Sequence, residues 1–165
     1  MALFGRTTID DPDLRQLVGR RRVLASGRGP LGQVLGLADA LLWSDGATCH
    51  ELGWHDVERG GWDRESAMLR WRTVDGAETA LPLTETGMLP DLFNERVTAS
   101  IACVRNVDLT GSGTAVISAR RNLADNRASL IWRVTPGKGT TPGQVAADPS
   151  VALELDRLRA EYDLG

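Results

Sequence analysis

Short apolar runs separated by turn residues constrain the fold of this chain more than any other feature. Within residues 23–83, Asp45-Gly46 and Asp75-Gly76 each stand between two such runs. Asp-Gly tolerates positive φ and suits the tip of a two-residue hairpin. Apolar and basic residues alternate across 68–72, as they do in a strand with one buried face. Regularly spaced short strands of this kind predict a sandwich or a small antiparallel barrel.

The segment 31–43 fits two structures. Six of its apolar residues also share one face of a helix: Leu31, Val34, Leu35, Ala38, Leu41 and Leu42. Gly32 and Gly36 each oppose a helix by roughly 1 kcal/mol relative to alanine. We therefore favour two strands over one helix in this segment.

The pattern changes after residue 83. Pro90 suits the first turn of a helix, where no hydrogen-bonded amide is lost. The apolar residues around it share one face of that predicted helix: Leu89, Leu92, Phe93, Val97 and Ile101. The sequence thus predicts an amphipathic helix that caps the core of the preceding strands.

The remainder of the chain predicts a small α/β extension. Strands are expected over 104–109, 114–121 and 128–135, and a flexible loop over 136–143. A last helix is expected to begin at Asp148-Pro149, since an aspartate followed by proline is typical of a helix start. Its apolar residues form a single stripe, which should lie on the sheet: Val151, Leu155, Leu158 and Tyr162.

Two segments resemble a known family. Residues 53–63 (GWHDVERGGWD) and 89–97 (LPDLFNERV) are similar to the central strands and the helix start of an uncharacterised actinobacterial family with a bacterial pleckstrin-homology-like (PH-like) domain. The resemblance implies an α+β fold that is mainly antiparallel β, a bent barrel capped by the amphipathic helix. The expected organisation is an N-terminal arm over 1–21, a PH-like domain over 22–104 and the extension over 105–165. It implies no catalytic residues, because the family has no known activity.

Charge and composition exclude several classes of function. The net charge is −3, and neither half of the chain has the basic excess of a nucleic-acid-binding protein. No apolar run approaches the ~18 residues of a membrane span, and no secretory signal is visible. Two cysteines, Cys49 and Cys103, are too few for a disulfide framework. These features predict a cytoplasmic protein with both thiols free.

The motifs that suggest chemistry are weak, and we expect no cofactor, metal or catalytic residue. Residues 27–32 (GRGPLG) match a dinucleotide-binding glycine pattern, but the following sequence lacks the required helix and the βαβ alternation. Cys49, His50 and His55 could suggest a metal site, yet neighbouring residues 49 and 50 would point to opposite faces of a strand. No G-x-S-x-G nucleophile motif is present.

The best candidate for a site is a surface that binds a partner protein or a second copy of the chain. Trp54 and Trp62 flank a charged segment that contains His55, Asp56 and Arg59. Tryptophan and arginine are enriched at the energetic centres of protein interfaces. The sequence therefore predicts a non-catalytic interaction module, an adaptor or a homo-oligomer.

The alternative is a binder of a small anionic or phosphorylated ligand. It would use Arg28 in the first hairpin loop together with the run 20–22 (RRR). Arginine recognises phosphate and carboxylate with paired hydrogen bonds. The acidic balance of the chain disfavours a phosphoinositide as that ligand.

Overall fold

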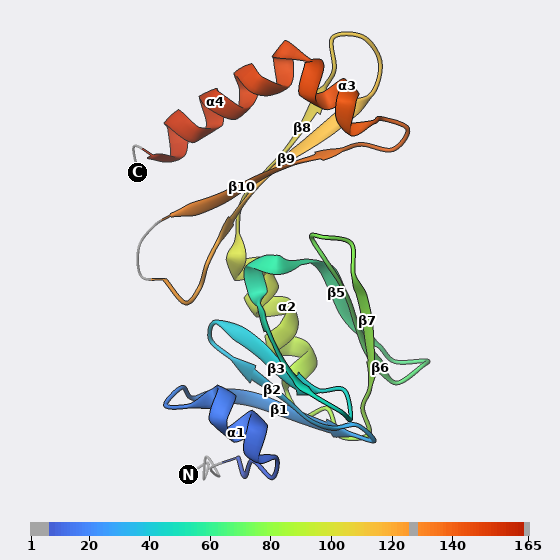
Figure 1. The fold of residues 1–165 in the computed structure, drawn as a ribbon, viewed down its shortest axis with the longest axis vertical. Coiled ribbons are helices and arrows are strands. Elements are labelled where there is room, and N and C mark those ends of the chain that lie inside the picture. The colour runs from blue at the N-terminus through green and yellow to red at the C-terminus, as the bar shows by residue number, and fades with distance from the viewer. Residues whose placement is uncertain (1–6, 126–128, 164–165) are drawn as a thin grey trace. The chain divides into compact units, whose positions relative to one another are not determined.

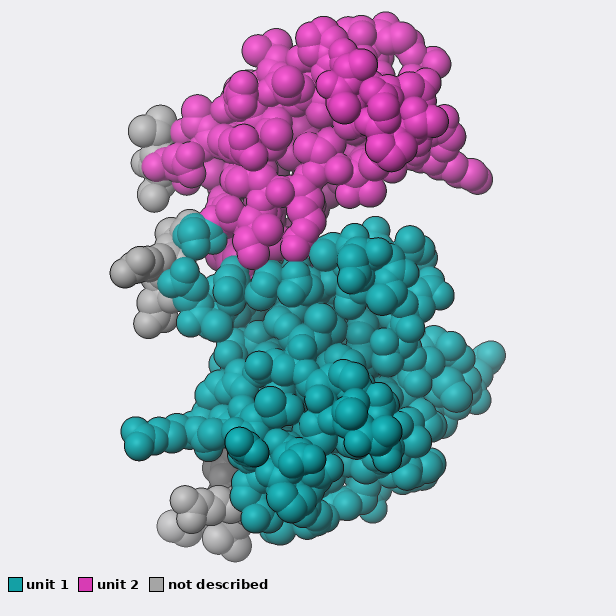
Figure 2. Space-filling view, in the orientation of Figure 1, with its two compact units in different colours: residues 1–100, 122–129 teal, residues 101–121, 130–165 magenta. Residues whose placement is uncertain are grey.

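The computed structural model describes residues 7–125 and 129–163. The chain forms two compact units, one of residues 1–100 and 122–129 and the other of residues 101–121 and 130–165 (Figures 1 and 2). Antiparallel strands predominate and helices cover them, so the protein has an α+β fold. In the described residues, no helix is both long and apolar enough to cross a membrane. The first six residues of the predicted arm lie outside the described residues.

The first sheet of unit 1 contains four antiparallel strands in the order of the chain. They are β1 (Val23–Gly29), β2 (Gly32–Leu37), β3 (Ala40–Ser44) and β4 (Cys49–Gly53). The turn between β3 and β4 contains Gly46 at φ 92°, a value that favours glycine. The preference for two strands in 31–43 is confirmed, because β2 and β3 occupy this segment.

The second sheet of unit 1 follows a short 3-10 helix, η1 (Trp54–Asp56), which redirects the chain. Its strands are β5 (Val57–Asp63), β6 (Met68–Thr73) and β7 (Glu78–Pro82), again antiparallel in chain order. Gly76, at φ 93°, lies in the β6–β7 turn. Both Asp-Gly turns predicted from the sequence are therefore confirmed as hairpin tips.

The helix α2 (Leu89–Ser100) follows the seven strands and contacts both sheets (Figure 1). Leu89, Leu92 and Phe93 are buried in a core that it shares with side chains from both sheets. Gly36 of β2 allows the close approach, since a Cβ there would lie 2.4 Å from Leu92 Cδ2. The predicted capping helix is confirmed, except that it ends at Ser100 and Ile101 already belongs to the next strand.

The predicted barrel is not closed. The two sheets of unit 1 are separate. Among the described residues, one isolated bridge, Arg28 to Glu85, links the edge strand β1 to the segment after β7. The Arg28 amide donates to the Glu85 carbonyl at 2.7 Å. A hydrogen-bonded barrel would need continuous pairing at this edge. The sheets instead meet through the shared core and α2.

A second core covers the opposite face of the first sheet. The helix α1 (Pro12–Val18) packs Leu14 and Val18 against the first sheet. Its partners there are the alternate residues of β2 and β3 that point away from the main core: Leu35, Leu37 and Leu42. Because both faces of this sheet are covered, β3 is buried along its whole length and β2 at every position after Gly32.

Unit 2 is a three-stranded antiparallel sheet in the order β10-β9-β8. The strands are β8 (Ile101–Asp108), β9 (Thr114–Arg121) and β10 (Leu130–Pro136). Residue 128, where the sequence predicts the last strand to begin, lies outside the described residues. β8 begins three residues earlier than predicted, because α2 passes into it without a loop.

Two helices follow the sheet of unit 2. The helix α4 (Pro149–Asp163) lays its predicted stripe on the sheet, with Leu158 fully buried and Trp132 against Tyr162 at 5.9 Å between ring centroids. The short helix α3 (Pro142–Ala147) was not predicted, since residues 136–143 read as a loop. It begins with a capping box in which Thr141 and Gln144 each accept a hydrogen bond from the other's backbone amide.

We expect Asp148 to make unit 2 sensitive to acid. Its carboxylate accepts hydrogen bonds from Ser150 and from the Thr110 amide and hydroxyl, the latter two at 2.8 Å, and these bonds lower its pKa to about 2. Because the folded pKa lies below the unfolded one, this stabilisation is present above pH ~3.9 and is lost as the pH falls towards 2. NMR titration of the Thr110 amide should show a midpoint near 2, and Asp148→Asn should abolish it. A midpoint near 4 would contradict the arrangement.

Candidate functional site

Trp54 is a core residue. Its side chain has no exposed surface, its indole N–H donates to the Leu37 carbonyl at 3.0 Å, and its ring meets Phe93 edge to face at 5.6 Å. A residue without exposed surface cannot contact a partner. We therefore remove Trp54 from the site predicted from the sequence and assign it to the packing beneath η1.

His55 and Asp56 lie in η1 beside Trp54. The His55 side chain is 15% exposed, and its Nε2 lies 3.4 Å from the Asp56 carboxylate. Gly53 makes room for the imidazole, since a Cβ at Gly53 would lie 2.4 Å from the ring. These contacts hold His55 against its own turn and leave it little surface for a partner.

Two arginines of the predicted anion site, Arg28 and Arg21, are paired with carboxylates of the chain. The Arg28 guanidinium pairs with Asp10 at 2.6 Å. Arg21 pairs with Asp39 at 3.0 Å and also with Glu51. Since carboxylates of the chain already occupy these two guanidinium groups, an anionic ligand would have to displace them.

Arg59 and Trp62 line a groove on the second sheet. The groove has a volume of about 730 Å³ and lies across β5, β6 and β7. Trp71, Leu69 and Leu81 point into the main core, so the alternate residues Arg70 and Ala80 point to the opposite, outer face. The groove is lined by Arg59, Gly60, Gly61, Trp62, Asp63, Arg70, Trp71, Arg72, Glu78, Thr79 and Ala80. Trp62 is opposite Leu69, which points into the core, so its half-buried side chain packs against the core rather than on the outer face.

The floor of the groove has small residues on both sides of Arg70. Gly61 of β5 faces Arg70 of β6 across the sheet, and Arg70 in turn faces Ala80 of β7. A Cβ at Gly61 would meet only Asn94 Oδ1, at 3.8 Å. An incoming group can therefore approach the sheet backbone closely at this point.

Three arginines project from the same outer face, and carboxylates of the chain hold two of them. Arg72 Nε lies 3.1 Å from Glu58, and Arg70 Nε lies 3.5 Å from Asp63. The Ser66 hydroxyl donates a hydrogen bond to the Asp63 carboxylate at 2.6 Å, and this bond is the main cause of the lowered pKa of Asp63. The Asp63 carboxylate therefore also stabilises the β5–β6 turn. Arg59 is exposed, and among the described residues it forms neither a hydrogen bond nor an ion pair through its side chain.

The sequence contained a partial signal for this groove. The alternation in 68–72 places Arg70 and Arg72 on one face of a strand, but it does not assign them to a site. The adjacent pair Gly60-Gly61 within a strand, next to Arg59, is the signal that could have indicated a hollow surface. Strand pairing, which brings Arg72 opposite Arg59, is not visible in the sequence.

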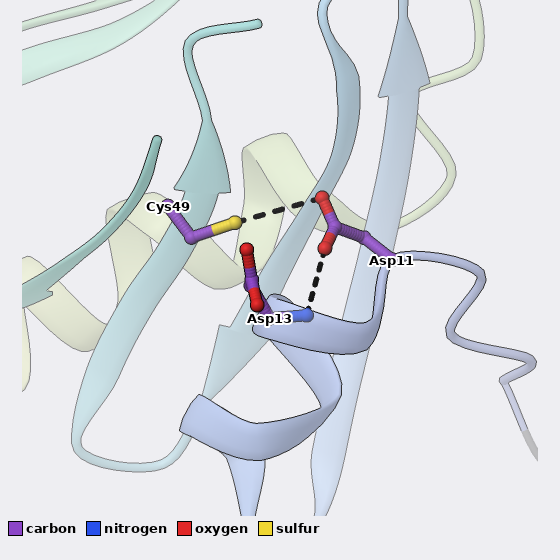
Figure 3. A group of neighbouring side chains, drawn as sticks. All are labelled: Asp11, Asp13 and Cys49. Carbon is purple, nitrogen blue, oxygen red and sulfur yellow. Dashed lines mark hydrogen bonds between the residues drawn. The ribbon is translucent and has the colours of Figure 1, made fainter. Parts of the chain in front are cut away.

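The positions of Cys49, His50 and His55 do not support a metal site formed by these three residues. In the described part of the chain, the one group of three or more candidate ligands is Asp11, Asp13 and Cys49 (Figure 3). Asp11 caps α1 by accepting from the Asp13 amide at 2.8 Å, and the Cys49 thiol donates to it at 3.5 Å. Burial and this carboxylate raise the pKa of Cys49, which disfavours the thiolate that a metal ligand requires.

His50 lies in an arrangement that resembles a proton relay but cannot act as one. Its Nε2 is 2.7 Å from Asp45 and 3.1 Å from the Thr48 hydroxyl. A relay uses one ring nitrogen for the nucleophile and the other for the acid. Because both contacts fall on the same nitrogen, His50 cannot transfer a proton from Thr48 towards Asp45. Its ring stacks on Trp43 at 5.2 Å, so its role is structural.

Comparison with known proteins gives no match to a family model, to a curated protein or to a solved structure.

Proposed function

We propose that this protein is a non-catalytic interaction module that binds a protein partner or a second copy of itself through the outer face of β5, β6 and β7. The observation that carries the proposal is the 730 Å³ groove on this face, which contains the exposed Arg59. Arginine is one of the residue types that most often dominate binding energy at protein interfaces. In contrast, the first sheet has both faces covered by cores of its own chain.

The fold proposal that accompanies this function is a PH-like domain. Seven antiparallel strands followed by one helix against their shared core support it, although the sheets remain separate. A cytoplasmic location is supported by Cys49 and Cys103, which are both free thiols, since a reducing compartment keeps thiols in this state.

Site-specific photocrosslinking in the native host tests the function. Ala80 lies in the groove, whereas Ala47 is also an exposed alanine of the same unit but lies in the β3–β4 turn. We expect p-benzoylphenylalanine at Ala80 to give one discrete covalent adduct, and the same residue at Ala47 to give none. The adduct should disappear when Arg59→Glu is added. Its mass distinguishes a partner from a second copy of the chain.

Two results would contradict the proposal. Equal adducts from Ala80 and Ala47 would indicate random collision rather than a binding surface. No adduct from Ala80, in a protein that keeps the wild-type far-UV spectrum, would show that the groove is not an interface.

A further inference from the structure

We infer that the groove recognises an acidic, partly apolar segment of its partner, and that Arg59 receives a single carboxylate from it. This inference rests on the proposed function and names the chemistry of the partner.

The first support is the charge balance of the groove. It contains three arginines, and Arg70 and Arg72 lie beside Asp63, Glu58 and Glu78, with Arg72 at 3.7 Å from Glu78. Only Arg59 lacks such a partner among the described residues. A group with one negative charge neutralises Arg59, whereas a phosphate with nearly two charges would meet repulsion from the surrounding carboxylates. The groove is therefore matched to a carboxylate.

The second support is the position of Arg59 in the sheet. Its cross-strand partner is Arg72, so two like charges face each other on adjacent strands. A like charge in this position offers no ion pair to Arg59. The register therefore leaves the charge of Arg59 available to a carboxylate from outside the chain.

The third support is the floor beside Arg59. Gly61 and Ala80 present only backbone and a methyl group on the outer face, on either side of Arg70. An apolar side chain next to the carboxylate can fill this space, as in pockets that combine an apolar lining with a few polar anchors. An aspartate or glutamate adjacent to an apolar residue has the required chemistry.

Selection of random peptides displayed on phage tests the inference with the full chain as bait. We expect the wild-type protein to enrich peptides with aspartate or glutamate next to an apolar residue. Arg59→Glu should lose this preference and favour lysine or arginine instead. Arg20→Glu is the matched control, because Arg20 is an exposed arginine outside the groove and its replacement changes the net charge equally. It should enrich the same peptides as the wild type.

Calorimetry with a selected peptide measures the contact directly. Arg59→Ala, or glutamine in place of the acidic residue of the peptide, should weaken binding by about 10- to 100-fold. Phosphoserine in place of that residue should also weaken binding. A third variant, Gly61→Leu, fills the floor without changing charge and should weaken binding while Arg59 remains.

The possible results distinguish a failure of the carboxylate inference from a failure of the proposed function. Two results would overturn the carboxylate inference. One is enrichment of peptides without acidic residues by the wild-type protein, and the other is enrichment of the same acidic peptides by Arg59→Glu. Tighter binding of the phosphoserine peptide would replace carboxylate with phosphate. If crosslinking from Ala80 succeeds while acidic peptides are not enriched, the interaction surface stands and only its chemistry is wrong.

Discussion

Replacing Trp54 with alanine is expected to lower the free energy of unfolding by about 3–5 kcal/mol, the usual cost of removing a large buried aromatic side chain. Trp54 is fully buried, packs on Phe93 and donates to the Leu37 carbonyl, so the change leaves a cavity and removes this hydrogen bond. Urea unfolding followed by far-UV circular dichroism measures the loss.

Trp62→Ala is the matched control for this prediction. Trp62 is half-buried at the edge of the same core, so its replacement should cost about 1 kcal/mol. A change within about 0.5 kcal/mol for Trp54→Ala would contradict its assignment to the core.

Gly60→Ala is expected to destabilise the protein, whereas Gly61→Ala is not, although the two residues are adjacent. A Cβ at Gly60 would lie 2.5 Å from the Arg70 carbonyl oxygen, 2.7 Å from Trp71 Cβ and 2.9 Å from Phe93. The Arg70 backbone is fixed by pairing on both sides, so it cannot move away. Overpacking of this kind costs about 1–3 kcal/mol or more.

Gly61 faces the groove, where a methyl group meets nothing closer than 3.8 Å. Alanine loses less backbone entropy than glycine in a strand, so Gly61→Ala should be neutral or stabilising by up to about 1 kcal/mol. Thermal unfolding of both variants beside the wild type gives the comparison. If Gly60→Ala were as stable as Gly61→Ala, the assignment of the two glycines to opposite faces of β5 would be wrong.

Local signals in the sequence were sufficient for most individual elements. Asp45-Gly46 and Asp75-Gly76 predict turns because their chemistry acts within a few residues. Pro90 and Pro149 indicate helix starts for the same reason. The end of α2 was placed wrongly because Ile101 continues the apolar spacing of the helix, and spacing alone does not distinguish the last helical residue from the first residue of a strand.

The candidate site depended on contacts between distant residues and was harder to predict. Trp54 and Trp62 look equivalent in the sequence, but Trp54 in η1 is completely buried, whereas Trp62 packs half-buried against the edge of the same core. Arg28 looked available for an anion until the fold brought Asp10 to it, 18 residues away in the chain. The side of a sheet that each residue faces, and the carboxylates that surround an arginine, are properties of the assembled fold.

The small helix α1 has a consequence for any attempt to shorten this protein. This helix shields Leu35, Leu37 and Leu42 from water on the face of the first sheet that points away from the main core. Cutting the chain between α1 and β1 would uncover an apolar β-rich surface of the kind through which protein chains associate and aggregate. A shortened protein that contains only the two sheets of unit 1 and α2 would therefore aggregate rather than form a smaller stable domain.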